Sequence, residues 1–305
     1  MKKVNMGGGS NAASAIIMGC MRIAEKSPQE VCTLIEKSAE LGIDTFDHAD
    51  IYGGGASEEI FADALTRSSI KREDIILQSK CGIRSGYYDL SKDHIIESAE
   101  GILKRLHTDY LDVLLLHRPD TLMEPEEIAE AFDHLYESGK VRSFGVSNMN
   151  SMQIAYLQSI LHQRLVANQL QFSAAHTGIV DQGINVNMHN DTGIDRDGGI
   201  LEYCRMNRIT IQTWSSLQYG FFEGTFLENE KYPELNKALK EFADKRDISM
   251  SAAAIAWILR HPANMQAVVG TTNIVRLEEI AKAAEVSMSR PEWYEIYRAA
   301  GNMLP

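Results

Sequence analysis

The feature that most constrains this chain is a regular alternation of short apolar runs with longer amphipathic segments. Eight apolar runs recur, and each is followed by a stretch with helical periodicity. This pattern predicts an α/β protein with parallel strands covered by their connecting helices, and eight units favour a closed (β/α)8 TIM barrel. We expect residues 1–305 to form one domain. The predicted strands lie at residues 15–18, 43–47, 74–80, 111–117, 142–146, 165–170, 209–214 and 266–269.

The helices between these strands are recognised by residues typical of helix ends. Gly42 suits the end of one helix and Pro125 the start of another. Ser57 is the expected N-cap of the second helix, with Glu58 and Glu59 in its first turn. The predicted helices cover residues 28–41, 92–107, 125–138, 199–207, 233–245 and 249–260, with others starting near 57 and 150 and a C-terminal helix from about 274.

Two segments interrupt the alternation and predict long loops after strands six and seven. Residues 176–198 are rich in Gly, Asn and Asp, and residues 217–232 form the second insertion. In a barrel, both loops overhang the carboxyl ends of the strands, where loops shape substrate pockets. The alternative is that both are mobile surface loops.

Composition argues against several classes of partner. The net charge of −12 repels phosphate backbones, so we expect no nucleic acid partner, although a local basic pocket can still bind a small anion. No apolar run approaches the roughly 18 residues that span a bilayer. The four cysteines form no CxxC pair, and no secretory signal is apparent. We therefore expect a cytoplasmic protein with reduced thiols, either a monomer or a small homo-oligomer.

Polar residues end three consecutive predicted strands. Asp47, Lys80 and His117 each follow an apolar run, and parallel strand ends meet at one mouth of a barrel. Tyr52 lies five residues after Asp47, in the loop that covers this mouth. An acid, an ammonium, an imidazole and a phenol thus converge from distant positions.

This group of side chains suits the reduction of a carbonyl. Hydride transfer to carbon leaves negative charge on oxygen, which needs a proton, and a free phenol has a pKa of about 10. We expect the Lys80 ammonium to lower the pKa of Tyr52, and Asp47 to balance the charge of Lys80. His117 is placed to donate a hydrogen bond to the carbonyl.

The motifs that carry these residues resemble those of the aldo-keto reductase family, in the same order over nearly the whole chain. The resemblance implies a bacterial-type oxidoreductase that transfers hydride from NAD(P)H to an aldehyde or ketone. It also implies that Asp47, Tyr52, Lys80 and His117 form the catalytic tetrad, with Tyr52 as general acid/base. The motifs lie at residues 46–53, Lys80, 116–120, 145–148, 168–169 and 270–273.

The resemblance further implies contacts with the cofactor. Ser147, Asn148 and Gln169 match positions that bind the nicotinamide carboxamide, and Trp214 matches the aromatic residue that stacks on the nicotinamide ring. No GxGxxG motif opens a helix after a strand, so we expect the dinucleotide to bind without the glycine-rich motif of Rossmann folds. The remaining implied cofactor contacts are Ser215, Leu217, Gly270, Thr271, Thr272, Arg276 and Glu279.

The choice between NADP and NAD depends on the start of the last helix. Thr271, Thr272 and Arg276 match the segment that binds the adenosine 2′-phosphate, and a helix start with an adjacent guanidinium suits a phosphate. Gly270 stands where many family members carry Lys, which removes one positive charge. We expect NADP as the cofactor, with NAD as the alternative.

The substrate is predicted only as a small-molecule carbonyl. Its pocket is expected from the first loop, from residues 82–88 and from the two long insertions. The candidate lining residues are Met21, Arg22, Tyr87, His176, Tyr219 and Phe222.

Two other functions fit parts of the pattern. In a metal-dependent hydrolase, Asp47, His48, Asp50 and His117 would supply ligands, but Lys80 would place an ammonium among them and no HxH or HExxH spacing is present. We therefore expect no metal site. A non-catalytic, dinucleotide-binding regulatory subunit is the other alternative, on the basis of fold analogy alone.

Overall fold

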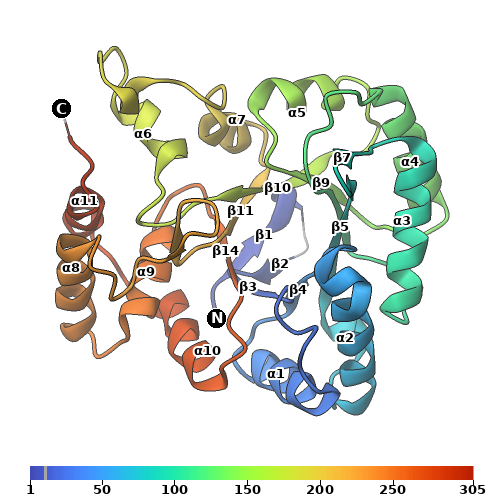
Figure 1. Ribbon diagram of the computed structural model, residues 1–305, viewed down its shortest axis with the longest axis horizontal. Helices are drawn as coiled ribbons and strands as arrows, with labels where there is room; N and C mark the ends of the chain where they lie inside the picture. The colour runs from blue at the N-terminus through green and yellow to red at the C-terminus, as the bar shows by residue number, and fades with distance from the viewer. Residues whose placement is uncertain (10–11, 305) are drawn as a thin grey trace.

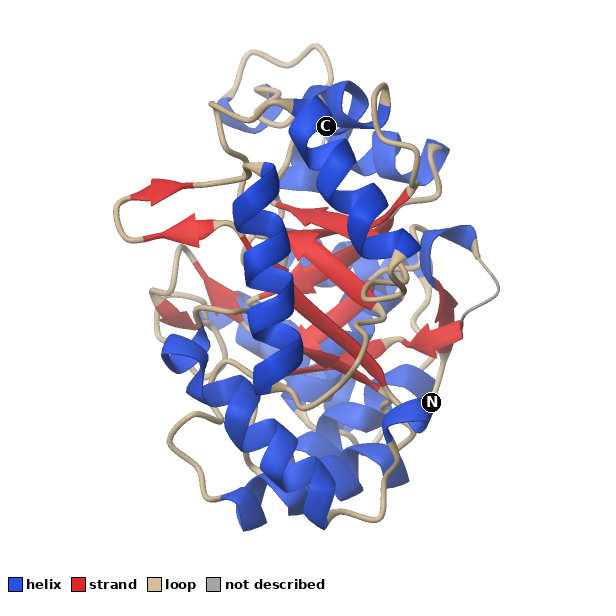
Figure 2. Cartoon of the chain, turned by 90° about the vertical axis from the view of Figure 1, so that its right-hand side faces the viewer, coloured by secondary structure: helices blue, strands red, loops and turns tan. Residues whose placement is uncertain are grey.

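Eight parallel strands close into a barrel in the computed structural model, which describes residues 1–9 and 12–304 (Figures 1 and 2). The strand order is β10-β11-β14-β3-β4-β5-β8-β9, and pairing of β14 with β3 joins the last barrel strand to the first. The predicted barrel is confirmed. Its strands are β3 (Ile16–Gly19), β4 (Thr45–Asp47), β5 (Ile76–Cys81), β8 (Val113–Leu116), β9 (Phe144–Ser147), β10 (Leu165–Gln171), β11 (Thr210–Trp214) and β14 (Gln266–Val269).

Helices surround this barrel, as Figure 1 shows, and they begin and end close to the predicted positions. Ser27 and Glu30 form a capping box at the start of the first helix, and Ser289 and Glu292 form one at the start of the last. The helices are α1 (Pro28–Glu40), α2 (Ala56–Arg67), α3 (Lys92–Arg105), α4 (Pro125–Glu137), α5 (Ser151–Gln158), α7 (Ile200–Met206), α8 (Pro233–Asp244), α9 (Met250–Leu259), α10 (Ile274–Ala281) and α11 (Arg290–Ala299).

The start of α2 differs from the prediction, because Ser57 is not its N-cap. The chain enters α2 through the 3₁₀ turn Tyr52–Gly55, whose three glycines have φ values of 59°, 65° and 99°. These left-handed positions favour glycine, and they let the helix begin before Ser57. The Ser57 hydroxyl instead donates to the Cys20 carbonyl, which ties α2 to the loop after β3.

The two long loops lie after β10 and β11, as predicted, but each contains secondary structure. α6 (Gly178–Ile184) and a 3₁₀ turn (Asp191–Gly193) precede α7, and the hairpin of β12 (Gln218–Tyr219) and β13 (Gly224–Thr225) follows β11. Elements this short do not show a hydrophobic period in the sequence. A second short hairpin, β6 (Ile83–Arg84) and β7 (Tyr87–Tyr88), follows β5.

An N-terminal hairpin covers the amino-terminal end of the barrel. β1 (Lys3–Asn5) and β2 (Ala12–Ser14) pair antiparallel, and Met6 of the intervening segment packs inside the barrel with Leu115 and Ala167. Gly7 has a φ of 63°, and a Cβ there would lie 2.7 Å from the side chain of Val166. Through Met6 and Gly7, the hairpin packs on the end of the barrel opposite the carboxyl ends of the strands.

The main hydrophobic core lies between the barrel and its helices. Trp257 of α9 stacks on Trp293 of α11 at 4.8 Å between ring centroids, and each indole N–H donates to the other's backbone carbonyl. This reciprocal pair attaches the C-terminal helix. Within the described residues, no helix has the length and apolarity needed to cross a membrane.

Candidate active site

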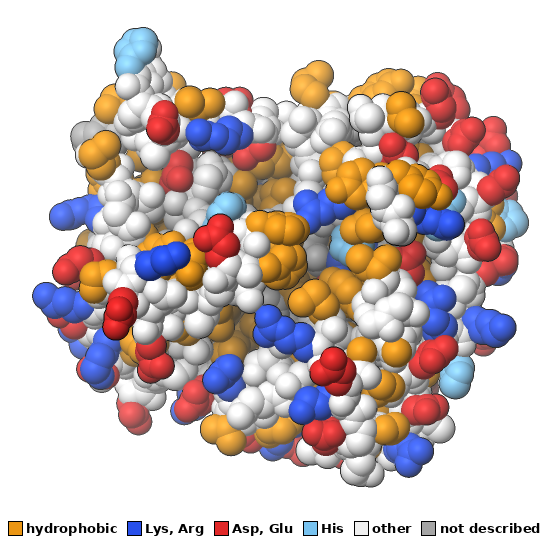
Figure 3. Space-filling model, viewed as in Figure 1, with side chains coloured by type: hydrophobic (Ala, Val, Ile, Leu, Met, Phe, Trp, Pro, Cys, Tyr) orange, Lys and Arg blue, Asp and Glu red, His pale blue; other side chains and the backbone are white. Residues whose placement is uncertain are grey.

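The carboxyl ends of the barrel strands open into a cavity of about 1040 Å³. Figure 3 shows the hollow near the centre of one face, with hydrophobic side chains gathered around it. Met21, Ile51, Phe221 and Phe222 are exposed residues of this apolar rim. Deeper lining residues come from the ends of seven strands: Gly19, Asp47, His117, Ser147, Gln169, Trp214 and Val269.

Three predicted catalytic side chains meet at the ammonium of Lys80, which is completely buried. Its Nζ lies 2.7 Å from Asp47 Oδ2, 2.7 Å from the backbone oxygen of His48 and 3.2 Å from the hydroxyl oxygen of Tyr52. An ammonium has three N–H donors, so each one has an acceptor. Because the neighbouring strands β4 and β5 hold Asp47 and Lys80, the position of the ammonium is set by the sheet.

The charges around this ammonium determine the state of Tyr52. Burial by itself disfavours a charged Lys80, but the Asp47 carboxylate outweighs it and raises the pKa of Lys80. Burial also raises the pKa of Tyr52, and Lys80 lowers that pKa only in part. This direction corrects the expectation that Lys80 brings the pKa of Tyr52 below its ordinary value, because burial, with the Asp47 charge adding to it, outweighs the effect of Lys80. Tyr52 therefore keeps its proton at neutral pH, and since its oxygen accepts from Lys80, its hydrogen is free to point into the cavity.

His117 lies on the cavity wall beside Tyr52, with their ring centroids 6.2 Å apart in an edge-on arrangement. Burial, together with the positive charges of Lys80 and Arg118, lowers the pKa of His117 well below its ordinary value. The imidazole is thus neutral. Its Nδ1 is buried and has no hydrogen-bond partner among the described residues, which favours the tautomer with hydrogen on Nε2. This tautomer can donate to a carbonyl oxygen.

The residues proposed for a metal site are not arranged as ligands. The His48 side chain is fully buried against Phe61, 4.6 Å between ring centroids, and burial with nearby Lys80 lowers the pKa of His48 to about 3. Neither His48 nor Asp50 lines the cavity. In the part of the chain that the structure describes, no three His, Cys, Asp or Glu residues are grouped to hold a metal ion. The Lys80 ammonium beside Asp47 would also repel a cation.

The predicted cofactor residues line the cavity, with one exception. Thr272 lies instead at a smaller cavity of about 250 Å³, together with Lys26. Consecutive residues of an extended segment point in opposite directions, so Thr271 faces the main cavity and Thr272 faces away from it. The predicted residues that do line the main cavity are Ser147, Asn148, Gln169, Trp214, Ser215, Leu217, Gly270, Thr271, Arg276 and Glu279.

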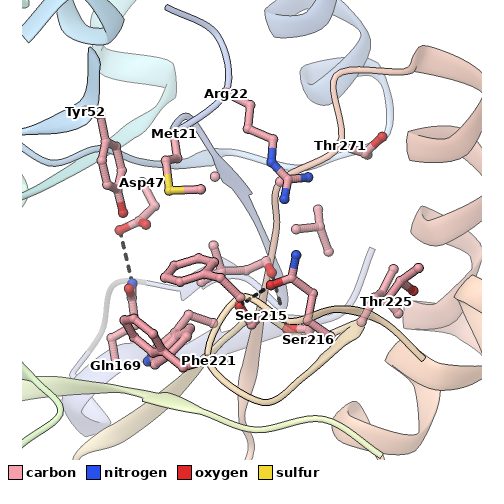
Figure 4. Close-up of a pocket in the computed structure, with 18 of the residues that line it drawn as sticks. Met21, Arg22, Asp47, Tyr52, Gln169, Ser215, Ser216, Phe221, Thr225 and Thr271 are labelled. Atoms are coloured by element: carbon pink, nitrogen blue, oxygen red, sulfur yellow. Dashed lines mark hydrogen bonds between the residues drawn. The ribbon is translucent and has the colours of Figure 1, made fainter. Parts of the chain in front are cut away.

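Hydrogen bonds join the four residues predicted to hold the nicotinamide. The Ser147 hydroxyl donates to the Gln169 backbone oxygen at 3.0 Å and accepts from the Asn148 amide at 2.8 Å. The Trp214 indole donates to Asn148 Oδ1 at 3.0 Å. Gln169 Nε2 in turn donates to Asp47 Oδ1 at 3.1 Å, a contact drawn in Figure 4. The predicted tetrad and these residues therefore form one continuous site.

The opposite end of the cavity suits an anion. Asn273 caps α10 by accepting from the backbone N–H of Arg276, which leaves other first-turn N–H groups available. The exposed Arg276 side chain lines the cavity here. Figure 4 shows a second guanidinium, that of Arg22, reaching toward the cavity between Met21 and Thr271. A helix start with guanidinium groups beside it favours phosphate.

The sequence matches the model of the Aldo/keto reductase family over residues 15–300. The chain belongs to the aldo/keto reductase family. It is 38% identical over 300 residues to the uncharacterized oxidoreductase YcsN of Bacillus subtilis, covering 94% of each chain. It is 36% identical over 301 residues to a 6-dehydroglucose reductase of Agrobacterium fabrum, again covering 94% of each. An aldo-keto reductase from Klebsiella pneumoniae, solved in complex with NADPH, has the same fold, with a TM-score of 0.77, 24% identity and coverage of 97% of this chain and 94% of that one.

The substrate side of this aldo/keto reductase was predicted only in part. Of the candidate lining residues, Met21, Arg22 and Phe222 line the cavity, and Tyr87, His176 and Tyr219 do not. Tyr88 lines it in place of Tyr87, because neighbouring residues of a strand point to opposite faces. Loop side-chain directions depend on packing that sequence patterns do not record.

Arg118 also lines the cavity, a position that the sequence pattern did not predict although this residue directly follows His117. Its guanidinium lies 5.8 Å from the ring centre of Trp214 and 5.8 Å from that of Phe221. No carboxylate among the described residues forms an ion pair with it. A basic residue next to a predicted catalytic histidine is the signal that could have found it.

Proposed function

We propose that this protein is an NADP-dependent carbonyl reductase in which Tyr52 is the general acid. The observation that carries this proposal is the hydrogen-bonding of Lys80 to both Asp47 and Tyr52, with the tyrosine at the wall of the cavity. This arrangement supplies a proton where a carbonyl oxygen needs one and places a positive charge beside the oxygen that gives it up.

Each residue has a separate part in the reaction. Ser147, Asn148 and Gln169 would hold the carboxamide of NADPH, and the bound cofactor would supply the hydride for the carbonyl carbon. His117 orients the carbonyl oxygen through Nε2–H. Tyr52 passes its hydroxyl proton to this oxygen, so that hydride and proton together give the alcohol. Lys80 stabilises the tyrosinate that remains, since its ammonium already donates to that oxygen.

Specificity for NADP is proposed to depend on Arg276, because Gly270 provides no charge. The NADPH complex of the Klebsiella pneumoniae enzyme, which shares this fold, supports the choice of cofactor. In Arg276→Gln, we expect the Kd for NADPH to rise about tenfold or more, because a charge-assisted hydrogen bond to the 2′-phosphate is lost. The Kd for NADH should change little. Quenching of tryptophan fluorescence measures both constants.

Lys282→Gln is the matched control for this cofactor test. Lys282 is a basic residue that follows α10 directly, and it does not line the cavity. Its substitution should leave both dissociation constants unchanged. An equal loss of affinity for NADPH and NADH in Arg276→Gln would contradict recognition of the 2′-phosphate.

The substrate is proposed to be a small hydroxylated aldehyde. Arg118 offers a multiple hydrogen-bond donor over the cavity, and the Agrobacterium fabrum relative is named for an oxidised sugar. In Arg118→Met, we expect the KM for a hydroxylated aldehyde to rise about tenfold, because roughly one hydrogen bond to a charged group is lost. The KM for benzaldehyde should change little. NADPH oxidation followed by absorbance gives both values.

Arg84→Met is the control for the substrate test. The Arg84 guanidinium is hydrogen-bonded to His94 and does not line the cavity. Loss of this guanidinium should therefore leave both KM values unchanged. The proposed substrate class would be wrong if Arg118→Met raised the KM for benzaldehyde as much as for the hydroxylated aldehyde.

A further inference from the structure

The interior of this barrel contains buried amides where branched apolar side chains usually pack. Gln78, Gln169, Gln212 and Gln266 project from β5, β10, β11 and β14, and all four are buried. Gln78 precedes Lys80 by two residues, and Gln212 precedes Trp214 by two. Since alternate residues of a strand share a face, Gln78 and Gln212 lie one layer beneath the proposed reacting groups. Neither of them lines the cavity.

Gln212 is the centre of the hydrogen bonds among these amides. Its Nε2 donates to Gln78 Oε1 at 2.9 Å and to Gln266 Oε1 at 3.1 Å. Its Oε1 accepts from Gln78 Nε2 at 2.8 Å and from Gln169 Nε2 at 3.3 Å. Gln212 therefore uses both donors and accepts two hydrogen bonds.

The two ends of the network decide which way each amide points. Gln266 donates to the backbone oxygen of Ser14 at 2.8 Å, and Gln78 donates to Asp47 Oδ1 at 2.6 Å. A carbonyl and a carboxylate can only accept, so the amides that face them must present N–H groups. Turning Gln212 around would place its N–H groups against those of Gln78. The network thus has one favourable arrangement.

This arrangement has a consequence at each side of the site. Asp47 Oδ1 accepts from Gln78 and Gln169, which leaves Oδ2 to accept from Lys80. Gln169 Nε2 donates its two hydrogens to Asp47 and Gln212. No donor among the described residues contacts Gln169 Oε1, and Gln169 lines the cavity. Its oxygen is therefore the atom left to contact a ligand.

We propose that Gln78 and Gln212 are positioning residues, which orient Asp47 for proton transfer and direct Gln169 Oε1 toward the N–H₂ group of the nicotinamide carboxamide. This inference rests on the proposed function. Gln78 contacts Asp47 and Gln212 but not Gln169, whereas Gln212 contacts Gln169 directly. Gln266 contacts neither Asp47 nor Gln169, so it supplies a buried amide for comparison.

The test compares binding of NADP with binding of its analogue in which an acetyl group replaces the carboxamide. The analogue keeps a carbonyl oxygen but cannot donate to Gln169 Oε1. For the wild-type protein, we expect the analogue to bind about fivefold to tenfold more weakly, the effect of one hydrogen bond. In Gln212→Met, Gln169 Nε2 keeps only its 3.1 Å hydrogen bond to Asp47, so the direction of Gln169 Oε1 is held less firmly and the ratio of the two Kd values should fall toward one. Fluorescence titration measures this ratio without turnover.

Two further variants separate positioning from packing. Gln78→Met should keep the wild-type Kd ratio and lower kcat about tenfold, because Asp47 loses one of its donors. It also tests the inference if Gln212→Met folds poorly. Gln266→Met removes a buried amide of similar size, but Gln212 keeps both hydrogen bonds with Gln78, which still fix its direction. The ratio and kcat should therefore both stay at their wild-type values, whatever the melting temperature.

The outcomes distinguish this inference from the function on which it rests. A wild-type protein that binds neither dinucleotide would show that the proposed function is wrong. If the wild-type protein binds and reduces as proposed, but Gln212→Met keeps its ratio and Gln78→Met keeps its kcat, only the inference is wrong. It is also wrong if Gln266→Met shifts the ratio as far as Gln212→Met does, because the network then acts through stability alone.

Discussion

Lys80→Met is expected to lower the free energy of unfolding by about 3–5 kcal/mol, the cost of leaving a buried charge without its partner. Lys80 and Asp47 lie 2.7 Å apart and both side chains are buried, so the Asp47 charge is left without its partner in the protein interior. The variant should also lose carbonyl reduction, because nothing then stabilises the tyrosinate of Tyr52. Urea unfolding followed by circular dichroism measures the first effect, and NADPH oxidation measures the second.

A double variant separates the two effects of losing Lys80. In Lys80→Met/Asp47→Asn, both charges are removed, and the Asn oxygen can still accept from Gln78 and Gln169. We expect much of the stability to return without activity. Equal stability of the single and double variants would show that the unpaired Asp47 charge is not the cause of the loss, and wild-type turnover in Lys80→Met would refute its part in catalysis.

Tyr52→Phe is expected to lower kcat by about 10²–10⁴-fold, the usual contribution of a general acid. The substitution removes one hydroxyl that lies 3.2 Å from Lys80 and keeps the ring that faces His117. The proposed cofactor contacts are made by other residues, so the Kd for NADPH should stay within about twofold. Steady-state kinetics and fluorescence titration on the same preparation test both statements.

Tyr88→Phe provides the matched control for the general acid. Tyr88 also lines the cavity, but it lies on the β6–β7 hairpin and does not contact Lys80. Its loss of a hydroxyl should leave kcat within a few-fold of wild type. If Tyr52→Phe kept more than a tenth of the wild-type kcat, the proton would have to come from another group. A binding protein without catalysis would show no turnover in either variant or in the wild type.

The placement of three residues of the predicted tetrad could be predicted because it follows from short-range patterns. Asp47, Lys80 and His117 each come at the end of an apolar run, and any closed parallel barrel brings such ends to one mouth. Helix ends were predictable for the same reason, since Pro125 marks the start of α4 by its own chemistry. The exception at Ser57 arose where three left-handed glycines start the helix early.

The states and directions of side chains could not be predicted in this way. The pKa of Tyr52 depends on burial and on the Asp47 charge, which act through space rather than along the chain. Thr272 and Tyr87 were predicted to line the cavity, but their neighbours Thr271 and Tyr88 do so. Packing decides which way a loop side chain points. Gln78 and Gln212 were missed altogether, since 134 residues separate them and each looks like an ordinary polar residue in a strand.

The sequence by itself determined the barrel and the end of the barrel at which the predicted catalytic residues lie. Hydrophobic periodicity and the order of the strands can both be recognised from neighbouring residues. Only the tertiary structure decided how that chemistry is held. Closing the ring brought β5 and β11 within hydrogen-bond reach across the barrel interior, buried the Lys80 ammonium beside Asp47 and left Tyr52 with its proton. These outcomes depend on distances between strands far apart in sequence and on the exclusion of water, and both exist only after the chain has folded.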